Sequence, residues 1–508
     1  MTASFPQSSS LQTFLAANFQ KKPLPMAFFG VLLGLSAPGY HLWWLAWLAI
    51  APALLWTYQC PTFQQRAWGG FWFGFCFQAA YCLWFFDLHP LTWLGFDELS
   101  SRLVTLAGWL LIGTEGGLLT SGFFGLADPN KPFAWRLFGL PLAWIALFSM
   151  LNATPLALPW GLLEYTQAGL WPLRWLASQL GGVGIVFSLI VYAVLLAESV
   201  RAIEANPLNR PNILKTVILF CLPGLLALLN ALPEPQKGAH IPMPVAIVQA
   251  NLPIELIRSG QLTEEESKSA YLHPIQTTYF PTGSLILLPE EGAAPGLVDL
   301  ASPLDHPILG QLAHLAQLKA VSIALGISSQ SPNGQLFNSI ALLPATAKEP
   351  IRFYHKRRLV PFGEYTPYQL GDFLSKALRT FQVEYSAPYT MGQSTQPLAA
   401  GPYQLGGLVC FELIDGSFTE AYRKRGADLL INLSNLGWFH QNPLIEAQFL
   451  AIGQLRAAES RTPLAIASNT GISAILSGTG AILTQSHPWP PMSARPKPRQ
   501  SQILFYNN

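Results

Sequence analysis

Charged side chains are scarce in this sequence. Aspartate, glutamate, lysine and arginine make up 11% of the 508 residues, whereas about 25% is usual in soluble globular proteins. The net charge is only +2, so there is no broad basic field for nucleic acid, and we expect no nucleic-acid partner. Hydrophobic residues make up 51% and the mean hydropathy is +0.32. This composition excludes a disordered or fibrous chain and indicates a membrane protein.

Cysteine is also scarce, with five residues in the whole chain, and this number excludes a disulfide scaffold. Cys410 is the only cysteine after residue 240, so it has no disulfide partner within that part of the chain. A lone thiol fits a reactive nucleophile, and it fits an inert buried side chain equally well. Composition alone leaves both interpretations open.

The few charged residues are unevenly distributed. Residues 1–240 contain 20 of them and residues 241–508 contain the other 36. Apolar runs fill the first part, and a run of about 20 residues is enough to span a bilayer. We predict spanning helices near 41–58, 67–86, 103–127, 134–151, 181–200 and 213–232, with a shorter run at 24–37. Residues 1–236 are therefore expected to form a transmembrane helical domain with about seven spans.

Lysine and arginine lie mainly on one side of these predicted spans. If the N-terminus is cytoplasmic, the outside loops hold only Arg102 and Arg174. The inside segments then hold Lys21, Lys22, Arg66, Lys131, Arg136, Arg201, Arg210 and Lys215. Because cytoplasmic loops carry the excess of basic residues, everything after Lys237 is expected on the outer face of the membrane.

The second part of the chain alternates short apolar runs with helical patterns. Runs of strand type occupy 245–251, 284–290, 320–328, 337–343, 406–412, 428–434 and 463–469, and helical patterns occupy 306–318 and 444–461. This alternation is typical of an α/β layered domain. We place a catalytic domain at 243–485 and a C-terminal surface tail at 486–508, which is rich in proline, serine and basic residues.

Three predicted strand ends carry complementary chemical groups. Cys410 ends one apolar run, Glu290 follows Pro289 at the end of another, and Lys356 and Glu364 lie within residues 354–365. A thiol that attacks a carbonyl needs a base to take its proton and a donor to stabilise the oxyanion. These residues supply both, although glutamate and lysine also occur on any protein surface.

The motifs around these residues resemble a known family. The second half resembles the carbon–nitrogen hydrolase (nitrilase) superfamily, and the whole chain resembles the apolipoprotein N-acyltransferases, the membrane-embedded family within it. The most specific match is the segment 354–367. Further matches are 248–251, 456–461 and 469–473, with 37–49 and 158–167 in the membrane half.

The resemblance implies a polytopic α-helical membrane domain followed by an α/β nitrilase-like αββα sandwich domain. Glu290 corresponds to the base, Lys356 to the lysine that stabilises the oxyanion, and Cys410 to the nucleophile of a Glu–Lys–Cys triad. Glu364 and Glu412 correspond to supporting acids. Phe411 and Trp438 are possible substrate-pocket residues. No metal and no cofactor is implied.

The reaction implied by the resemblance is lipoprotein maturation in the bacterial cytoplasmic (inner) membrane, with the catalytic domain on the periplasmic face. An acyl chain passes from a membrane phospholipid, through a Cys thioester acyl-enzyme, to the N-terminal amine of a diacylglyceryl-cysteine apolipoprotein. Two alternatives stay open. One is a membrane-tethered amidase or nitrilase-type hydrolase, and the other is a non-enzymatic membrane receptor or transport component on the same fold.

The chain departs from the family pattern at four places. Phe411 stands where the family commonly has tyrosine, and Leu436 replaces the acid of the usual Asn-Asp-x-Trp-Phe segment. Glu291 is an extra acid beside Glu290, and we expect Glu290 to be the base because it directly follows Pro289. The terminal spanning helix common in the family is also expected to be missing.

Overall fold

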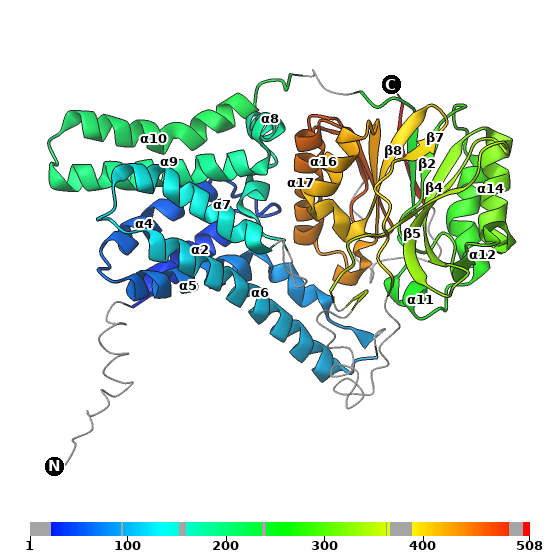
Figure 1. Ribbon diagram of the computed structural model, residues 1–508, viewed down its shortest axis with the longest axis horizontal. Helices are drawn as coiled ribbons and strands as arrows, with labels where there is room; N and C mark the ends of the chain where they lie inside the picture. Colours follow the sequence, from blue (N-terminus) through cyan, green and yellow to red (C-terminus); the bar gives the residue numbers. More distant parts are fainter. Residues whose placement is uncertain are drawn as a thin grey trace, which may run out of the picture.

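The computed structural model describes residues 22–92, 95–151, 159–235, 240–361, 363–365, 389–486 and 501–507. A helical half precedes an α/β half, and the two pack side by side (Figure 1). Some residues used in the sequence predictions lie outside the described residues: Lys21, Leu158, Lys237, Phe362, Pro367 and 487–500.

The helical half follows the predicted apolar runs. Its helices are α2 (Leu24–Gly34), α3 (Leu45–Leu48), α4 (Ile50–Tyr58), α5 (Phe63–Tyr81), α6 (Glu98–Leu126), α7 (Leu140–Leu151), α8 (Trp171–Leu180), α9 (Gly182–Ala205) and α10 (Arg210–Asn230). Within the described residues α6, α9 and α10 are long and apolar enough to cross a membrane. Shorter apolar helices occupy Leu24–Gly34, Leu45–Tyr58 and Trp135–Met150.

Helices α5 and α6 pack closely because their contact faces carry small residues. A methyl group added to Gly74 would lie 2.2 Å from the carbonyl oxygen of Gly116, so only glycine permits this approach. Close backbone packing of this kind is a main source of helix association in membranes. The N-caps Thr62 and Asp97 fix where the two helices begin, because each side chain accepts a backbone N–H of the first turn.

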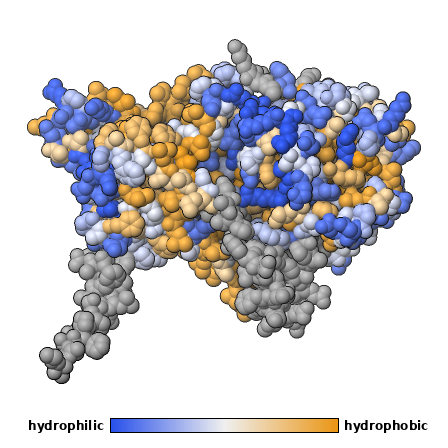
Figure 2. Space-filling model, in the orientation of Figure 1, coloured by the Kyte–Doolittle hydropathy of each residue, from blue (hydrophilic) through white to orange (hydrophobic). Residues whose placement is uncertain are grey.

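Hydrophobic side chains gather on the surface of the helical half, whereas the α/β half is mainly hydrophilic in the same view (Figure 2). Helix α10 is an example, with Phe220 62% and Leu228 70% exposed. Soluble proteins rarely expose apolar patches of this extent. The surface therefore belongs to a membrane protein whose helices face lipid.

Two β-sheets form the α/β half. The first has the order β13-β1-β2-β4-β5-β6, with β3 paired to β4, and the second has the order β12-β11-β10-β9-β8-β7. The first comprises Val245–Gln249 (β1), Leu285–Leu287 (β2), Leu297–Asp299 (β3), Ser322–Gln330 (β4), Leu336–Leu343 (β5), Arg352–His355 (β6) and Gln502–Tyr506 (β13). The second comprises Leu398–Ala400 (β7), Tyr403–Val409 (β8), Leu429–Ser434 (β9), Leu464–Ser468 (β10), Ala474–Leu476 (β11) and Ile482–Gln485 (β12).

Helices cover the outer face of each sheet. Helices α11 (Ile254–Arg258), α12 (Glu264–Ser267), α13 (His273–Thr277) and α14 (Pro307–Lys319) lie beside the first sheet. Helices α16 (Gly416–Lys424) and α17 (Pro443–Ser460) lie beside the second, between it and the helical half (Figure 1). The four layers confirm the predicted αββα sandwich behind a helical domain.

One expectation for the C-terminus needs correction. The segment 486–508 was expected to be a surface tail, but Gln502–Tyr506 forms strand β13 and pairs antiparallel with β1, with Ile247 opposite Leu504. The physical reason is the apolar run Ile503-Leu504-Phe505-Tyr506, which can complete the edge of the sheet. The end of the chain is therefore part of the sandwich.

Candidate active site

Cys410 lies at a sharp turn. Strand β8 ends at Val409 and a 3-10 helix, η8 (Cys410–Ile414), begins at the cysteine. The φ angle of Cys410 is +48°, and such a left-handed conformation in a residue other than glycine costs about 1–3 kcal/mol. The Asn432 side chain stabilises the turn by donating to the Cys410 carbonyl oxygen at 3.1 Å. The turn places the cysteine at the end of a buried strand, where the residue as a whole is half-buried.

Glu412 ties this turn to the loop that follows Lys356. Its side chain is fully buried, and its Oε2 accepts the Val409 backbone N–H at 2.8 Å. Its Oε1 accepts the backbone N–H groups of Arg357 and Arg358 at 2.7 and 3.1 Å, and the Tyr354 hydroxyl donates at 2.8 Å. One carboxylate therefore fixes the position of the cysteine turn relative to the lysine loop.

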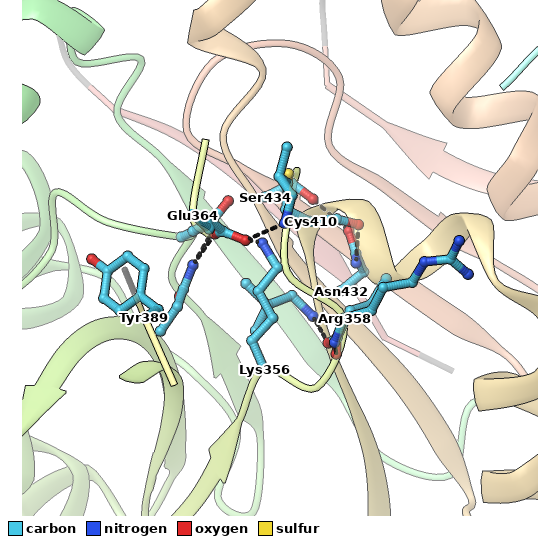
Figure 3. Close-up of polar contacts among 12 residues, drawn as sticks. Lys356, Arg358, Glu364, Tyr389, Cys410, Asn432 and Ser434 are labelled. Carbon is cyan, nitrogen blue, oxygen red and sulfur yellow. Dashed lines mark hydrogen bonds and ion pairs between the residues drawn. The ribbon is translucent and has the colours of Figure 1, made fainter. Parts of the chain in front are cut away.

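Glu290, Lys356 and Glu364 form a buried cluster with Asn338, a residue of β5. The Lys356 Nζ donates to Glu364 Oε1 at 2.8 Å and lies 3.7 Å from Glu290 Oε1. The Asn338 amide donates to both carboxylates, at 2.8 Å to Glu290 and 2.9 Å to Glu364. All four side chains are at most 6% exposed. Figure 3 shows Lys356 and Glu364 next to Cys410.

The cluster keeps its lysine charged. Burial by itself lowers the pKa of Lys356, but the negative charges of Glu364 and Glu290 outweigh this effect, so the pKa lies above its ordinary value. Burial by itself raises the pKa of Glu364, but the Lys356 charge and the hydrogen bonds from Lys356, Val360 and Asn338 leave it below its ordinary value. A cation is thus fixed beside the thiol in a water-poor setting, where charges interact strongly.

The thiol itself is held in its neutral form. Burial raises the pKa of Cys410 most, and the Glu290 carboxylate raises it further, whereas the Lys356 charge and a backbone N–H of Asn435 lower it. The net pKa lies well above the ordinary value for cysteine. The thiol therefore needs a base to take its proton before it can attack.

The two adjacent acids lie in a bend beyond the end of β2, where the regular alternation of a strand no longer holds. Glu290 is 4% exposed and faces Lys356, whereas Glu291 adopts a left-handed φ of +60°. Gly326 of β4 passes directly beneath Glu290: a methyl group there would lie 2.6 Å from the Glu290 Cα. Only glycine leaves room for Glu290 in this place.

Phe411 and Trp438 flank the turn and the lysine loop. Phe411 is 7% exposed, and the Arg358 guanidinium lies 5.7 Å from its ring centroid. Arg358 also forms an ion pair of 2.6 Å with Asp415, the residue that follows η8. Trp438 is half-buried, and a methyl group on Gly363 would lie 3.8 Å from its ring. Their part in a substrate pocket stays a prediction.

Leu436, where the family pattern has an acid, is buried and packs against Gly471. The polar contacts of this loop come from other residues. The Asn435 side chain accepts the Gly437 N–H at 3.0 Å, and Glu255 lies 3.5 Å from the His440 ring. The loop is therefore held without the missing carboxylate.

The structure brings the predicted site residues together and adds some that the sequence analysis missed. Asn338 is the most important of these, because it joins the two acids of the cluster. A signal was present: Asn338 is polar within the otherwise mostly apolar strand Leu336–Leu343. Sequence spacing could not reveal the contacts of three further groups, because their partners are distant in the sequence. These groups are Asn432, Tyr354 and the Arg358–Asp415 pair. Among the described residues no cluster of three or more His, Cys, Asp or Glu could hold a metal ion.

Comparison with known proteins follows the two halves of the structure. The family model for the apolipoprotein N-acyltransferase N-terminal domain matches residues 29–195, and that for carbon-nitrogen hydrolase matches residues 245–493. An apolipoprotein N-acyltransferase of Photobacterium profundum is 29% identical over 469 residues, 90% of this chain and 85% of the relative. The chain is homologous to the apolipoprotein N-acyltransferases along almost its whole length.

Further apolipoprotein N-acyltransferases are similar to a comparable degree. The enzyme of Gloeobacter violaceus is 28% identical over 468 residues, 89% of this chain and 83% of the relative. Among solved structures, Saccharomyces cerevisiae Nit3 of the nitrilase superfamily aligns with 52% of this chain and 89% of its own, at 13% identity. Its TM-score of 0.37 is too low to add to the assignment.

Proposed function

We propose that this protein transfers an acyl chain from a membrane phospholipid to the N-terminal amine of a diacylglyceryl-cysteine lipoprotein. The observation that carries the proposal is the meeting of a neutral thiol, a buried carboxylate and a buried lysine cation at Cys410, Glu290 and Lys356. The names of the relatives support lipoprotein N-acylation. The apolar surface of the attached helices suits a reaction in which both substrates are anchored in lipid.

In the first half-reaction the Glu290 carboxylate takes the proton of Cys410, and the sulfur attacks the ester carbonyl carbon. The Lys356 ammonium, with backbone N–H groups, stabilises the oxyanion that forms. The C–O bond then breaks, the proton passes from Glu290 to the departing alkoxide, and a lysophospholipid leaves. Glu364 and Asn338 hold Lys356 and Glu290 in place, and Glu412 holds the cysteine turn.

In the second half-reaction the free amine of the lipoprotein attacks the thioester carbonyl. Glu290 takes a proton from the amine, the C–S bond breaks, and the proton returns to Cys410. The product is an amide, so the lipoprotein gains a third acyl chain. Because water would discharge the thioester, Phe411 and Trp438 are proposed to shield the site with their apolar rings.

We further propose that the α/β half lies on the outer face of the bacterial inner membrane. Arg66 pairs with Asp128, and Arg136 and Arg201 share Glu198, so these basic residues gather at one end of the helices. Arg174, by contrast, donates to the Thr479 carbonyl oxygen of the α/β half. The end rich in basic residues is therefore distinct from the end that contacts the α/β half, as expected if that half is periplasmic.

A mass spectrum of the purified protein after incubation with phospholipid vesicles tests the proposal. We expect a mass increase of one acyl chain on Cys410, which a diacylated lipopeptide with a free N-terminal amine removes. Cys410→Ala should show no adduct and no transfer. An adduct discharged by water as fast as by the amine would instead indicate a hydrolase. No thiol reactivity at all would indicate a non-enzymatic role.

A further inference from the structure

The segment 435–442 connects the candidate active site with the helical half. The segment directly continues strand β9, whose Asn432 donates to the Cys410 carbonyl oxygen at 3.1 Å. Trp438, in its middle, lies beside Gly363 in the loop that carries Glu364. At its end, Asn442 caps helix α17 by accepting the Leu444 N–H at 2.7 Å. A shift of this segment would therefore change the surroundings of Cys410.

The backbone of this segment is strained near its end. His440 has a φ of +45° and Gln441 a φ of +64°. Residues other than glycine keep such a conformation only where surrounding contacts impose it. Glu255 and Asn251 of the α/β half contact His440 and Gln441 at 3.5 and 3.1 Å, and the helical half adds two further hydrogen bonds.

Asp87, in the 3-10 helix η1 (Leu83–Leu88) of the helical half, contacts the residues on both sides of Gln441. Its backbone carbonyl oxygen lies 2.7 Å from His440 Nδ1, which must carry the proton because a carbonyl only accepts. Its Oδ2 accepts the Asn442 side-chain N–H at 2.6 Å. One residue thus fixes the segment immediately before and immediately after Gln441.

Trp84, three residues earlier, secures η1 in its place. Its ring packs edge-on against Phe439 at 5.0 Å between centroids, and its N–H donates to the Gln448 Oε1 at 2.9 Å. Gln448 is fully buried in α17 and also accepts the Trp160 N–H at 2.7 Å. Asp87 therefore acts from a fixed position.

We propose that Asp87 is a positioning residue of the active site: by holding His440 and Asn442 it fixes the segment 435–442, so the helical half sets part of the geometry at Cys410. The inference rests on the proposed function, because it gives the helices a part in transfer beyond anchoring. It also explains how the loop keeps its shape although Leu436 provides no acid.

A swap of the two hydrogen-bonding groups tests the proposal in full-length protein in phospholipid nanodiscs. Asn442→Asp keeps an N-cap residue on α17 but places two carboxylates face to face, so we expect N-acylation of a diacylated lipopeptide to fall roughly 10- to 100-fold. Adding Asp87→Asn restores a donor and an acceptor in reversed order, and the rate should return to within about threefold of the wild type. Asp97→Asn is the matched control, an exposed acid in the same connection between α5 and α6, and it should leave the rate unchanged.

Hydrogen exchange of the 435–442 amides provides a second measurement that does not depend on activity. Exchange should rise in Asn442→Asp and fall again in the double variant, while the unfolding midpoint stays constant. Wild-type transfer in Asn442→Asp, or a double variant no faster than Asn442→Asp, would overturn the proposal. If the wild type itself transfers nothing, the proposed function fails, and hydrogen exchange alone decides whether Asp87 holds the segment.

Discussion

Glu290 and Glu291 are neighbours in the sequence with different surroundings. Glu290 accepts from Asn338 and lies within 3.7 Å of the Lys356 ammonium. The backbone of Glu291 is left-handed, so this residue no longer follows the regular geometry of the strand. The surroundings of each carboxylate, and not its residue type, decide which one can serve the thiol.

We predict that Glu290→Gln slows acylation of Cys410 by roughly 10²–10⁴-fold, which is typical of the loss of a general base. Glu291→Gln should keep most of the rate. The measurement is the rate at which the acyl adduct forms on each variant with phospholipid vesicles. If Glu291→Gln were the inactive variant, the base would be the other carboxylate, although the similarity to the apolipoprotein N-acyltransferases would stand.

The pKa of Cys410 gives a second test at this scale. The Glu290 carboxylate raises that pKa, so neutralising it in Glu290→Gln should lower it. The pH profile of Cys410 alkylation by iodoacetamide should then move to lower pH than in the wild type. Glu291→Gln is the control and should leave the profile in place. A shift to higher pH in Glu290→Gln would contradict the arrangement of charges described above.

At the scale of elements, the site is built where strands end. Strands β2, β6 and β8 lead into Glu290, Lys356 and Cys410, and β5 supplies Asn338. Because these strands belong to two facing sheets, the side chains at their ends converge on one place. The spacing between sheets, and the absence of a side chain at Gly326, determine how closely Glu290 can approach.

We predict that Gly326→Ala reduces acylation of Cys410 strongly, by about 10²-fold, the effect expected when a catalytic group moves by about 1 Å. The added methyl group would meet the Glu290 backbone at 2.6 Å, so Glu290 must move. Gly169→Ala is the control, because its methyl group meets nothing within 4 Å. Comparing adduct formation in the two variants, at equal unfolding midpoints, checks the prediction.

At the scale of the whole molecule, the two halves form one unit. Helix α17 lies against the second sheet on one side and against the helical half on the other (Figure 1). Arg456 of α17 donates to the Tyr165 hydroxyl at 2.8 Å, and Gly182 at the start of α9 donates to Glu459 at 2.7 Å. Both contacts are largely buried, and such charge-assisted bonds are among the stronger ones in proteins. The orientation of the helices therefore also sets the orientation of the sandwich.

The proposed orientation gives a test with single cysteines. In a variant without the five native cysteines, Lys424→Cys in exposed α16 should react with a membrane-impermeant maleimide in intact spheroplasts. Lys131→Cys, in the exposed loop between α6 and α7, is the matched control and should react only after the membrane is opened. The reverse pattern would place the α/β half in the cytoplasm.

The sequence by itself determined the class of each half and the order of the halves. Long apolar runs located most helices of the first half, although α8 was missed. Shorter patterns located α14 and α17 and the strands β1, β2, β4, β5, β8, β9 and β10, whereas the short helices α11–α13 and α16 and the remaining strands were not predicted. The motif resemblance pointed to Glu290, Lys356 and Cys410, and the structure places them around one cluster. The sequence could not identify the hydrogen-bond partners of these residues. Contacts such as Asn338 with Glu364, or Glu412 with Val409, depend on where separate strands end.

Only the tertiary structure showed which segments distant in the sequence contact one another. The pairing of β13 with β1 closes one sheet with the end of the chain, and no local pattern fixes that partner. Asp87 and Asn442 are separated by 355 residues, and no sequence period relates them. Local sequence fixes which conformation each segment prefers, whereas the packing of the two halves decides which polar groups meet. The surroundings of Cys410 depend on both.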